Sequence, residues 1–213
     1  MLKATLYIAI GILSLSMLSA CQFTDQQQQE FNPEKAALAR LKVGLGYLAQ
    51  AKDPTDKTSE EIKLAHYNLT LANQYSPNNP NVMLGMALFD QHVGEYQEAE
   101  MIYQAITEME PNNGLYQIHY GSFLCATNHY EQAIAHYTQA IELNKPRWKI
   151  DGLEQMGYCA IQHDDTIRAD NAFKTLFSYD STRRKHVENT ARLYEQKGDL
   201  RITNYLLTVI NRY

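Results

Sequence analysis

The sequence lacks the motifs by which most catalytic and nucleotide-binding sites are recognised. It has no glycine-rich phosphate-binding loop, no G-x-S-x-G nucleophile elbow and no H-E-x-x-H zinc motif. No two of its seven histidines are spaced as H-x3-H. We therefore predict a protein that is not an enzyme and that binds no metal and no cofactor.

Positive charge is also scarce. Nineteen Lys and Arg residues face twenty-four Asp and Glu residues, which gives a formal net charge of −5. No basic stripe interrupts this mild acidity, and a nucleic-acid-binding protein would need one. The composition therefore argues against a nucleic-acid partner.

Long apolar runs are almost absent, and the one exception lies at the amino terminus. Residues 6–17 are an uncharged, largely apolar run, which is too short for a comfortable membrane span. Lys3 precedes the run, and the small residues Ser19 and Ala20 follow it. This order is typical of a targeting signal that is later removed, so we assign residues 1–20 to a signal peptide.

Cysteine is rare, with three in the chain, and the first directly follows this signal peptide. Leu18-Ser19-Ala20-Cys21 resembles the lipobox of bacterial lipoproteins. The resemblance implies that Cys21 carries a diacylglyceryl thioether and an acylated amino group, and several acyl chains anchor a protein stably. Gln22 stands where an aspartate would signal inner-membrane retention, which implies an outer-membrane lipoprotein facing the periplasm. The alternative is a secreted protein whose cysteine follows the leader by chance.

Residues 21–36 contain the run QFTDQQQQEFNP and have little to bury. A segment of this composition is expected to remain flexible. We interpret it as a tether between the lipidated cysteine and a folded domain.

Small and aromatic residues recur at fixed spacings within residues 114–146. They are Tyr120, Gly121, Tyr130, Ala133, Tyr137, Ala140 and Pro146. This pattern resembles the tetratricopeptide repeat, a pair of antiparallel helices with a period of about 34 residues. Gly121 and Ala133 are expected at the closest approach of the two helices, and Pro146 is expected to help end the second.

The same frame fits the rest of the chain. It predicts an all-α tetratricopeptide-repeat superhelix (α-solenoid) of about five helix-turn-helix repeats, with ten helices in antiparallel pairs. The repeats are predicted at about 37–79, 80–113, 114–149, 150–183 and 184–213. Residues 52–59, with the sequence KDPTDKTS, are an insertion in the first repeat that we predict to be a loop.

The other two cysteines, Cys125 and Cys159, fall on the first helices of consecutive repeats. Their offsets in the frame are not equivalent, and helical residues at such offsets often point apart. We predict two buried thiols that act as small apolar side chains. A disulfide is the alternative, because a periplasmic location permits one.

Two sequence runs narrow the resemblance. The first repeat carries Val43-Gly44-Leu45-Gly46-Tyr47-Leu48, and a later one carries His119-Tyr120-Gly121-Ser122-Phe123-Leu124. Together with the lipobox and the Gln-rich tether, they resemble the PilF/PilW-type pilotins, lipoproteins of type IV pilus biogenesis. The chain departs from that family in its insertion and in having about five repeats rather than six.

This resemblance implies a binding module on the outer membrane that helps the type IV pilus secretin to localise and multimerise. The secretin would then be the protein partner, and we expect the chain itself to be a monomer. The alternative is a general periplasmic tetratricopeptide scaffold lipoprotein for peptidoglycan enzymes or outer-membrane protein assembly.

Five offsets of the first helix typically face the concave groove of a tetratricopeptide array. At these offsets the first three repeats carry apolar residues, which we predict to form a partner-binding groove: Leu38, Leu41, Leu45, Leu48, Leu84, Leu88, Leu115 and Ile118. The fourth and fifth repeats carry mostly charged residues there: Asp151, Glu154, Gln162, Lys185, Glu188, Arg192 and Glu195. An apolar stripe on such a surface marks an interaction site. The alternative is that the tether or the insertion covers these leucines.

Overall fold

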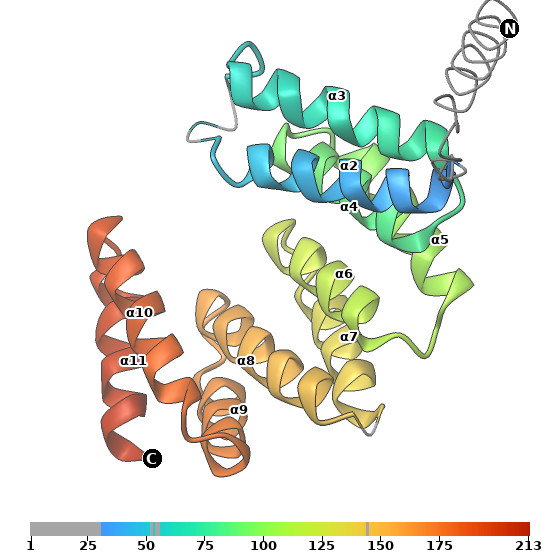
Figure 1. Cartoon of the computed structure of the whole chain (residues 1–213). Helices are drawn as coiled ribbons and strands as arrows, with labels where there is room; N and C mark the ends of the chain where they lie inside the picture. Colours follow the sequence, from blue (N-terminus) through green and yellow to red (C-terminus); the bar gives the residue numbers. More distant parts are fainter. Residues whose placement is uncertain (1–30, 52, 54–55, 144) are drawn as a thin grey trace, which may run out of the picture. The chain divides into compact units, whose positions relative to one another are not determined.

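The computed structural model describes residues 31–213 except 52, 54, 55 and 144. The predicted signal peptide, Cys21 and most of the tether lie outside the described residues. Within them all regular structure is α-helical (Figure 1). The helices are α2 (Pro33–Leu48), α3 (Glu60–Tyr75), α4 (Pro80–His92), α5 (Tyr96–Met109), α6 (Gly114–Ala126), α7 (Tyr130–Glu142), α8 (Pro146–Gln162), α9 (Thr166–Tyr179), α10 (Arg183–Gln196) and α11 (Leu200–Arg212).

Consecutive helices pack in pairs, namely α2 with α3, α4 with α5, α6 with α7, α8 with α9 and α10 with α11. First helices of neighbouring repeats also touch, as α2 with α4 and α6 with α8. The prediction of a five-repeat tetratricopeptide array is therefore confirmed. Each helix pair needs its neighbours, because one repeat alone leaves an apolar face uncovered.

The turn inside four of the pairs contains a residue with positive φ. These residues are Gly94 (80°), Asn128 (64°), Asp164 (61°) and Gly198 (80°). Glycine adopts this left-handed conformation freely, and asparagine and aspartate tolerate it better than most other residues. The residue types at this one turn position thus explain why each first helix ends there.

Pro146 has a different role from the predicted one. It is the first residue of α8, which begins four residues earlier than the predicted fourth repeat. Proline suits this position because its missing N–H would have no partner in the first helical turn. Similarly, α2 begins at Pro33, before the predicted start at residue 37.

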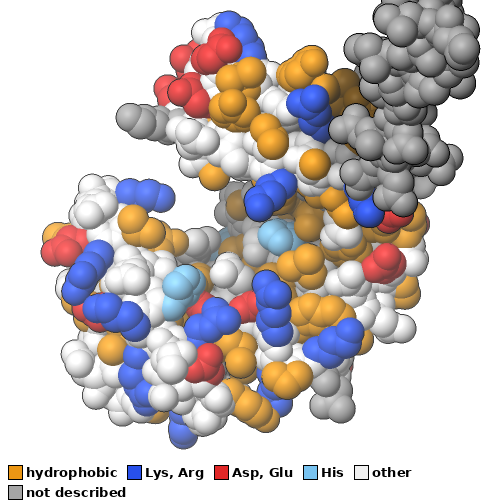
Figure 2. Space-filling view, viewed as in Figure 1, with side chains coloured by type: hydrophobic (Ala, Val, Ile, Leu, Met, Phe, Trp, Pro, Cys, Tyr) orange, Lys and Arg blue, Asp and Glu red, His pale blue; other side chains and the backbone are white. Residues whose placement is uncertain are grey.

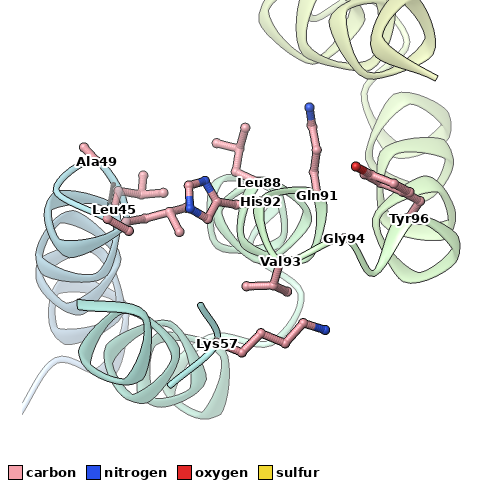
Figure 3. A pocket seen from close by; sticks show the side chains of 11 residues that line it. Leu45, Ala49, Lys57, Leu88, Gln91, His92, Val93, Gly94 and Tyr96 are labelled. Atoms are coloured by element: carbon pink, nitrogen blue, oxygen red, sulfur yellow. The ribbon is translucent and has the colours of Figure 1, made fainter. Parts of the chain in front are cut away.

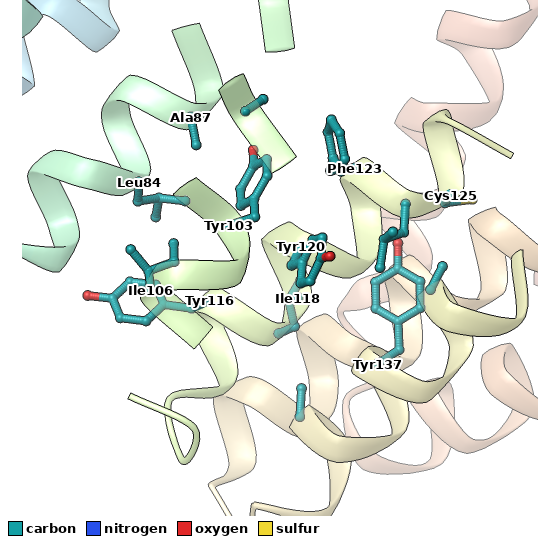
Figure 4. Close-up of a cluster of buried hydrophobic side chains, with 14 of the residues drawn as sticks. Leu84, Ala87, Tyr103, Ile106, Tyr116, Ile118, Tyr120, Phe123, Cys125 and Tyr137 are labelled. Atoms are coloured by element: carbon teal, nitrogen blue, oxygen red, sulfur yellow. The ribbon is translucent and has the colours of Figure 1, made fainter. Parts of the chain in front are cut away.

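Aromatic side chains fill the core between the second and third repeats. Figure 4 shows Tyr103 from α5, Tyr116, Tyr120 and Phe123 from α6, and Tyr137 from α7. The buried hydroxyl of Tyr103 donates a hydrogen bond to Gln91 Oε1 at 2.8 Å. Such a partner is needed when a tyrosine is buried. Two further clusters form the core of the α2–α4 region and of the α8–α11 region.

The prediction of two separate thiols is wrong: Cys125 and Cys159 form a disulfide, with Cα atoms 5.9 Å apart. Both lie where α6 packs against α8, and both are buried. The equivalent glycines Gly121 and Gly157 are 36 residues apart, whereas the cysteines are separated by 34. The non-equivalent offsets therefore place the two sulfurs face to face across adjacent helices instead of pointing them apart.

Candidate partner-binding groove

A pocket lies between the carboxyl-terminal ends of α2 and α4, and we call it the apolar pocket. It has a volume of about 840 Å³. Its lining consists of Leu45, Leu48, Ala49, Ala51, Lys57, Leu88, Gln91, His92, Val93, Gly94 and Tyr96. Figure 3 shows Leu45, Leu88 and Val93 around this space. Three residues of the predicted groove, Leu45, Leu48 and Leu88, thus meet in one place.

His92, the last residue of α4, also lines the apolar pocket. Its Nε2 is buried, and no hydrogen-bond partner for it exists among the described residues. In Figure 3 the imidazole extends from α4 toward Leu45. A buried polar atom without a hydrogen bond costs free energy. Because Nε2 itself is buried, it adds no hydrogen-bonding group to the surface of the pocket.

The insertion in the first repeat lies at the edge of this pocket. In its described part, Lys57 lines the pocket and forms an ion pair with Glu95 at 2.5 Å. Both side chains are about half exposed, so the pair contributes little to stability. Among the described residues of the insertion, Lys57 lines the apolar pocket.

The structure separates the other predicted groove residues. Leu41 and Leu84 are buried in the core at 9% and 7% exposure, and neither lines either of the two pockets described in this section. Leu38 is 41% exposed and lines neither of the two pockets described in this section. Leu115 and Ile118 line a second pocket farther along the chain.

This second pocket, which we call the charged pocket, is formed by α6, α8 and α10. It has a volume of about 330 Å³. The lining residues are Leu115, Ile118, His119, Ser122, Asp151, Glu154, Gln155, Arg183 and His186. Figure 2 shows many Lys and Arg side chains, with acidic ones among them, over the α8–α11 part of this face.

Glu154 is the most deeply buried charged residue of the charged pocket, with a side chain only 1% exposed. Its carboxylate accepts hydrogen bonds from Arg183 Nη1 at 2.7 Å and from the hydroxyl of Tyr158 at 2.9 Å, and it also pairs with His186. Arg183 Nη2 donates to Asp151 Oδ1 at 2.7 Å. The charge of Glu154 is thus compensated across the α8–α10 boundary, as a buried carboxylate requires.

Burial lowers the pKa of His119 on the opposite wall, because a buried imidazole is harder to charge. This histidine is therefore expected to be neutral near pH 7. Together with Leu115 and Ile118 it makes the α6 side of the charged pocket uncharged, while the α8 and α10 sides are ionic.

Sequence reasoning missed His92, Lys57, Arg183 and His186 as pocket residues. His92 and Arg183 lie at helix ends, outside the five groove offsets used for the prediction. Arg183 also precedes the predicted start of its repeat by one residue. A search that included the ends of first helices would have found both.

Cys125, Cys159 and His163 bring three metal-ligand atoms within 4.8 Å of one another. The two sulfurs are joined in the disulfide, however, and thiolates are the form that binds metals. This group is therefore structural in the oxidised protein.

None of the described helices combines the length and apolar character needed to cross a membrane.

The fold and its pockets define a tetratricopeptide-repeat protein. Solved structures with this fold include PilF of Pseudomonas aeruginosa, with a TM-score of 0.62 and 17% identity, covering 85% of this chain and 78% of that one. PilW, described as a widely conserved type IV pilus biogenesis factor, has a TM-score of 0.61 and 16% identity, covering 84% and 77%. MamA of Desulfovibrio magneticus has a TM-score of 0.52 and 14% identity, covering 83% and 94%. At these identities the likeness establishes the fold alone.

No protein-family model matches the chain. Sequence comparison gives a nearer relative, an uncharacterized protein of Haemophilus influenzae. It is 30% identical over 146 residues, which are 68% of this chain and 74% of the relative. The chain belongs to the same family as this Haemophilus protein.

Proposed function

We propose that the protein is an outer-membrane lipoprotein that acts as a pilotin in type IV pilus biogenesis. It would bind the secretin through the apolar pocket and help it to localise and multimerise. The observation that carries this proposal is the apolar pocket, formed by the first two repeats of a fold shared with the pilus biogenesis factor PilW. The lipobox resemblance at Cys21 adds the membrane anchor.

The disulfide supports the compartment in this proposal. Disulfides persist in oxidising compartments such as the bacterial periplasm and are rare in the cytosol. A bond between Cys125 and Cys159 therefore suits a protein that folds after export. The repeats would face the periplasm, held to the outer membrane through lipid on Cys21.

In the proposed complex, a segment of the secretin lays apolar side chains against Leu45, Leu48 and Leu88. Repeat grooves of this kind accept either an extended segment or an amphipathic helix. Each fully buried side chain contributes roughly 1.5–3 kcal/mol before the cost of ordering the segment.

The test replaces Leu45 and Leu88 together by Glu in the full chain. The expected result is loss of secretin capture and of secretin multimers by protein that circular dichroism shows to be folded, since both leucines are only partly buried. Leu38→Glu is the matched control, because Leu38 is an exposed leucine on α2 outside the pocket. Normal multimers in the double variant would overturn the pocket as the secretin site. Capture of a peptidoglycan enzyme instead would favour the general scaffold.

A second experiment tests the anchor. Metabolic labelling with a fatty-acid analogue should mark the wild-type protein and leave Cys21→Ser unlabelled. The variant should also leave the outer-membrane fraction. An unlabelled, fully soluble wild-type protein would contradict the lipoprotein assignment while leaving the pocket test intact.

A further inference from the structure

The charged pocket combines an aliphatic wall with an excess of negative charge. Leu115 and Ile118 of α6 form the wall, opposite the carboxylates of Asp151 and Glu154 on α8. We propose that this pocket binds a lysine or arginine side chain of a protein partner. The aliphatic stem would lie against Leu115 and Ile118, with the charged head group beside Asp151.

The guanidinium group of Arg183, the arginine in this lining, is already engaged by carboxylates. Arg183 uses Nη1 for Glu154 and Nη2 for Asp151, both at 2.7 Å, and its Nε lies 3.8 Å from Asp180. Three carboxylates therefore surround this one guanidinium group. An acidic ligand would have to separate Arg183 from the buried Glu154, and an uncompensated buried charge is costly.

Asp151 keeps an oxygen for a ligand. Its Oδ1 accepts from Arg183, while its Oδ2 lies 3.6 Å from Nε of Arg147, which is beyond normal hydrogen-bond distance. The Arg147 side chain is 84% exposed, so this pair is weak. A cation entering the pocket can bond to Oδ2 without breaking the Arg183–Glu154 pair.

The aliphatic wall selects a long basic side chain over a small cation. Lysine and arginine bury their methylene groups on apolar surface while the charged end reaches a polar partner. A purely aliphatic side chain would fill the same space but would remove water from Asp151 without replacing its hydrogen bond. The comparison of lysine with norleucine therefore isolates the charge. This inference does not depend on the pilus assignment, because it concerns any segment that occupies the pocket.

The probes are three acetylated, amidated hexapeptides of alanine with Lys, norleucine or Glu at the fourth position. Each is titrated into the full chain, and the NMR signals of the His119 and His186 C2 protons are followed. The lysine peptide is expected to shift both signals and to bind about tenfold more tightly than the other two, as a charge-assisted hydrogen bond predicts. Equal or tighter binding of the glutamate peptide, or no shift with lysine, would overturn the proposal.

Asp151→Asn should remove the preference for lysine. Glu188→Gln should retain it, since this carboxylate of α10 pairs with Lys185 and Arg192 and does not line the pocket. If the Asp151→Asn variant does not fold, a second measurement on the wild-type protein tests the same contact. Binding of the lysine peptide to the wild-type protein should weaken as salt is raised, because ions screen the contact. Salt-independent binding, or an unchanged preference in folded Asp151→Asn, would refute the proposed head-group contact.

Discussion

The ring of Tyr137 occupies the space that a side chain on Gly121 would need. A Cβ atom at Gly121 would lie 2.8 Å from Tyr137 Cε1 and 3.2 Å from the carbonyl oxygen of Ala133. One repeat later, a Cβ atom at Gly157 would lie 2.7 Å from Cε2 of Phe173. In both repeats an aromatic ring on the second helix packs against a glycine on the first, which fixes how closely the two helices approach.

Gly121→Leu is therefore expected to destabilise the fold by about 1–3 kcal/mol or more, because a close-packed core cannot absorb the added volume. Urea unfolding followed by circular dichroism measures the change. Gly46→Ala is the matched control, since a Cβ there meets nothing within 4 Å and alanine favours a helix. An unchanged unfolding midpoint for Gly121→Leu would mean that Tyr137 moves aside freely.

The disulfide should contribute substantially to stability. Joining residues 34 apart in sequence restricts the unfolded chain, and the entropic model gives roughly 3–4 kcal/mol for a loop of this size. Reductant should lower the melting temperature of the wild-type protein. The Cys125→Ala/Cys159→Ala variant should melt at a lower temperature and be insensitive to reductant. A wild-type melting curve that does not respond to full reduction would argue against this contribution.

The repeat architecture was predictable because its determinants are local and periodic. Gly121 and Gly157 on first helices, with Ala133 and Ala169 on second helices, recur where two helices must approach closely. Such small residues can be counted along a sequence without knowing the structure. Helix starts were less predictable, since Pro146 is compatible with both the end of one helix and the beginning of the next.

The site was only partly predictable. The groove offsets assume that every first helix presents the same face to the groove. In α2, however, Leu41 is buried in the core, while Leu45, four residues later, lines the apolar pocket. The partner of Arg183 could not be read from the sequence either. Its contact with Glu154 joins residues 29 apart across a repeat boundary, and the spacing of the repeats there is set by packing.

Asp90 on α4 should make stability depend on pH. Burial, with the nearby charges of Glu98 and Glu95, raises its pKa to about 6, whereas an unfolded aspartate titrates near 3.9. Between about pH 4 and pH 6 the folded state holds the proton more tightly. The contribution of Asp90 to the free energy of unfolding therefore falls as pH rises through this window.

Asp90→Asn should accordingly be more stable than the wild-type protein at pH 7, and the difference should vanish below about pH 4. Asp56→Asn provides a control of opposite sign. Hydrogen bonds from Thr58 lower the pKa of Asp56, so this carboxylate stabilises the folded state at neutral pH and loses that effect in acid. Urea midpoints at several pH values measure both, and a parallel response of the two variants would refute the assignment.

Leu41 and Leu38 test which leucines of α2 belong to the core. Leu41 is 9% exposed and lies against Gly85 of α4, so Leu41→Ala should leave a cavity and cost about 2–5 kcal/mol. Leu38 is 41% exposed, and Leu38→Ala should change stability by no more than about 0.5 kcal/mol. Chemical denaturation measures both. Because Leu41 does not line the apolar pocket, its variant should bind a partner normally per folded molecule. Weakened partner binding by folded Leu41→Ala would show that Leu41 belongs to the binding groove. Equally small losses of stability in Leu41→Ala and Leu38→Ala would show that Leu41 is not a core residue.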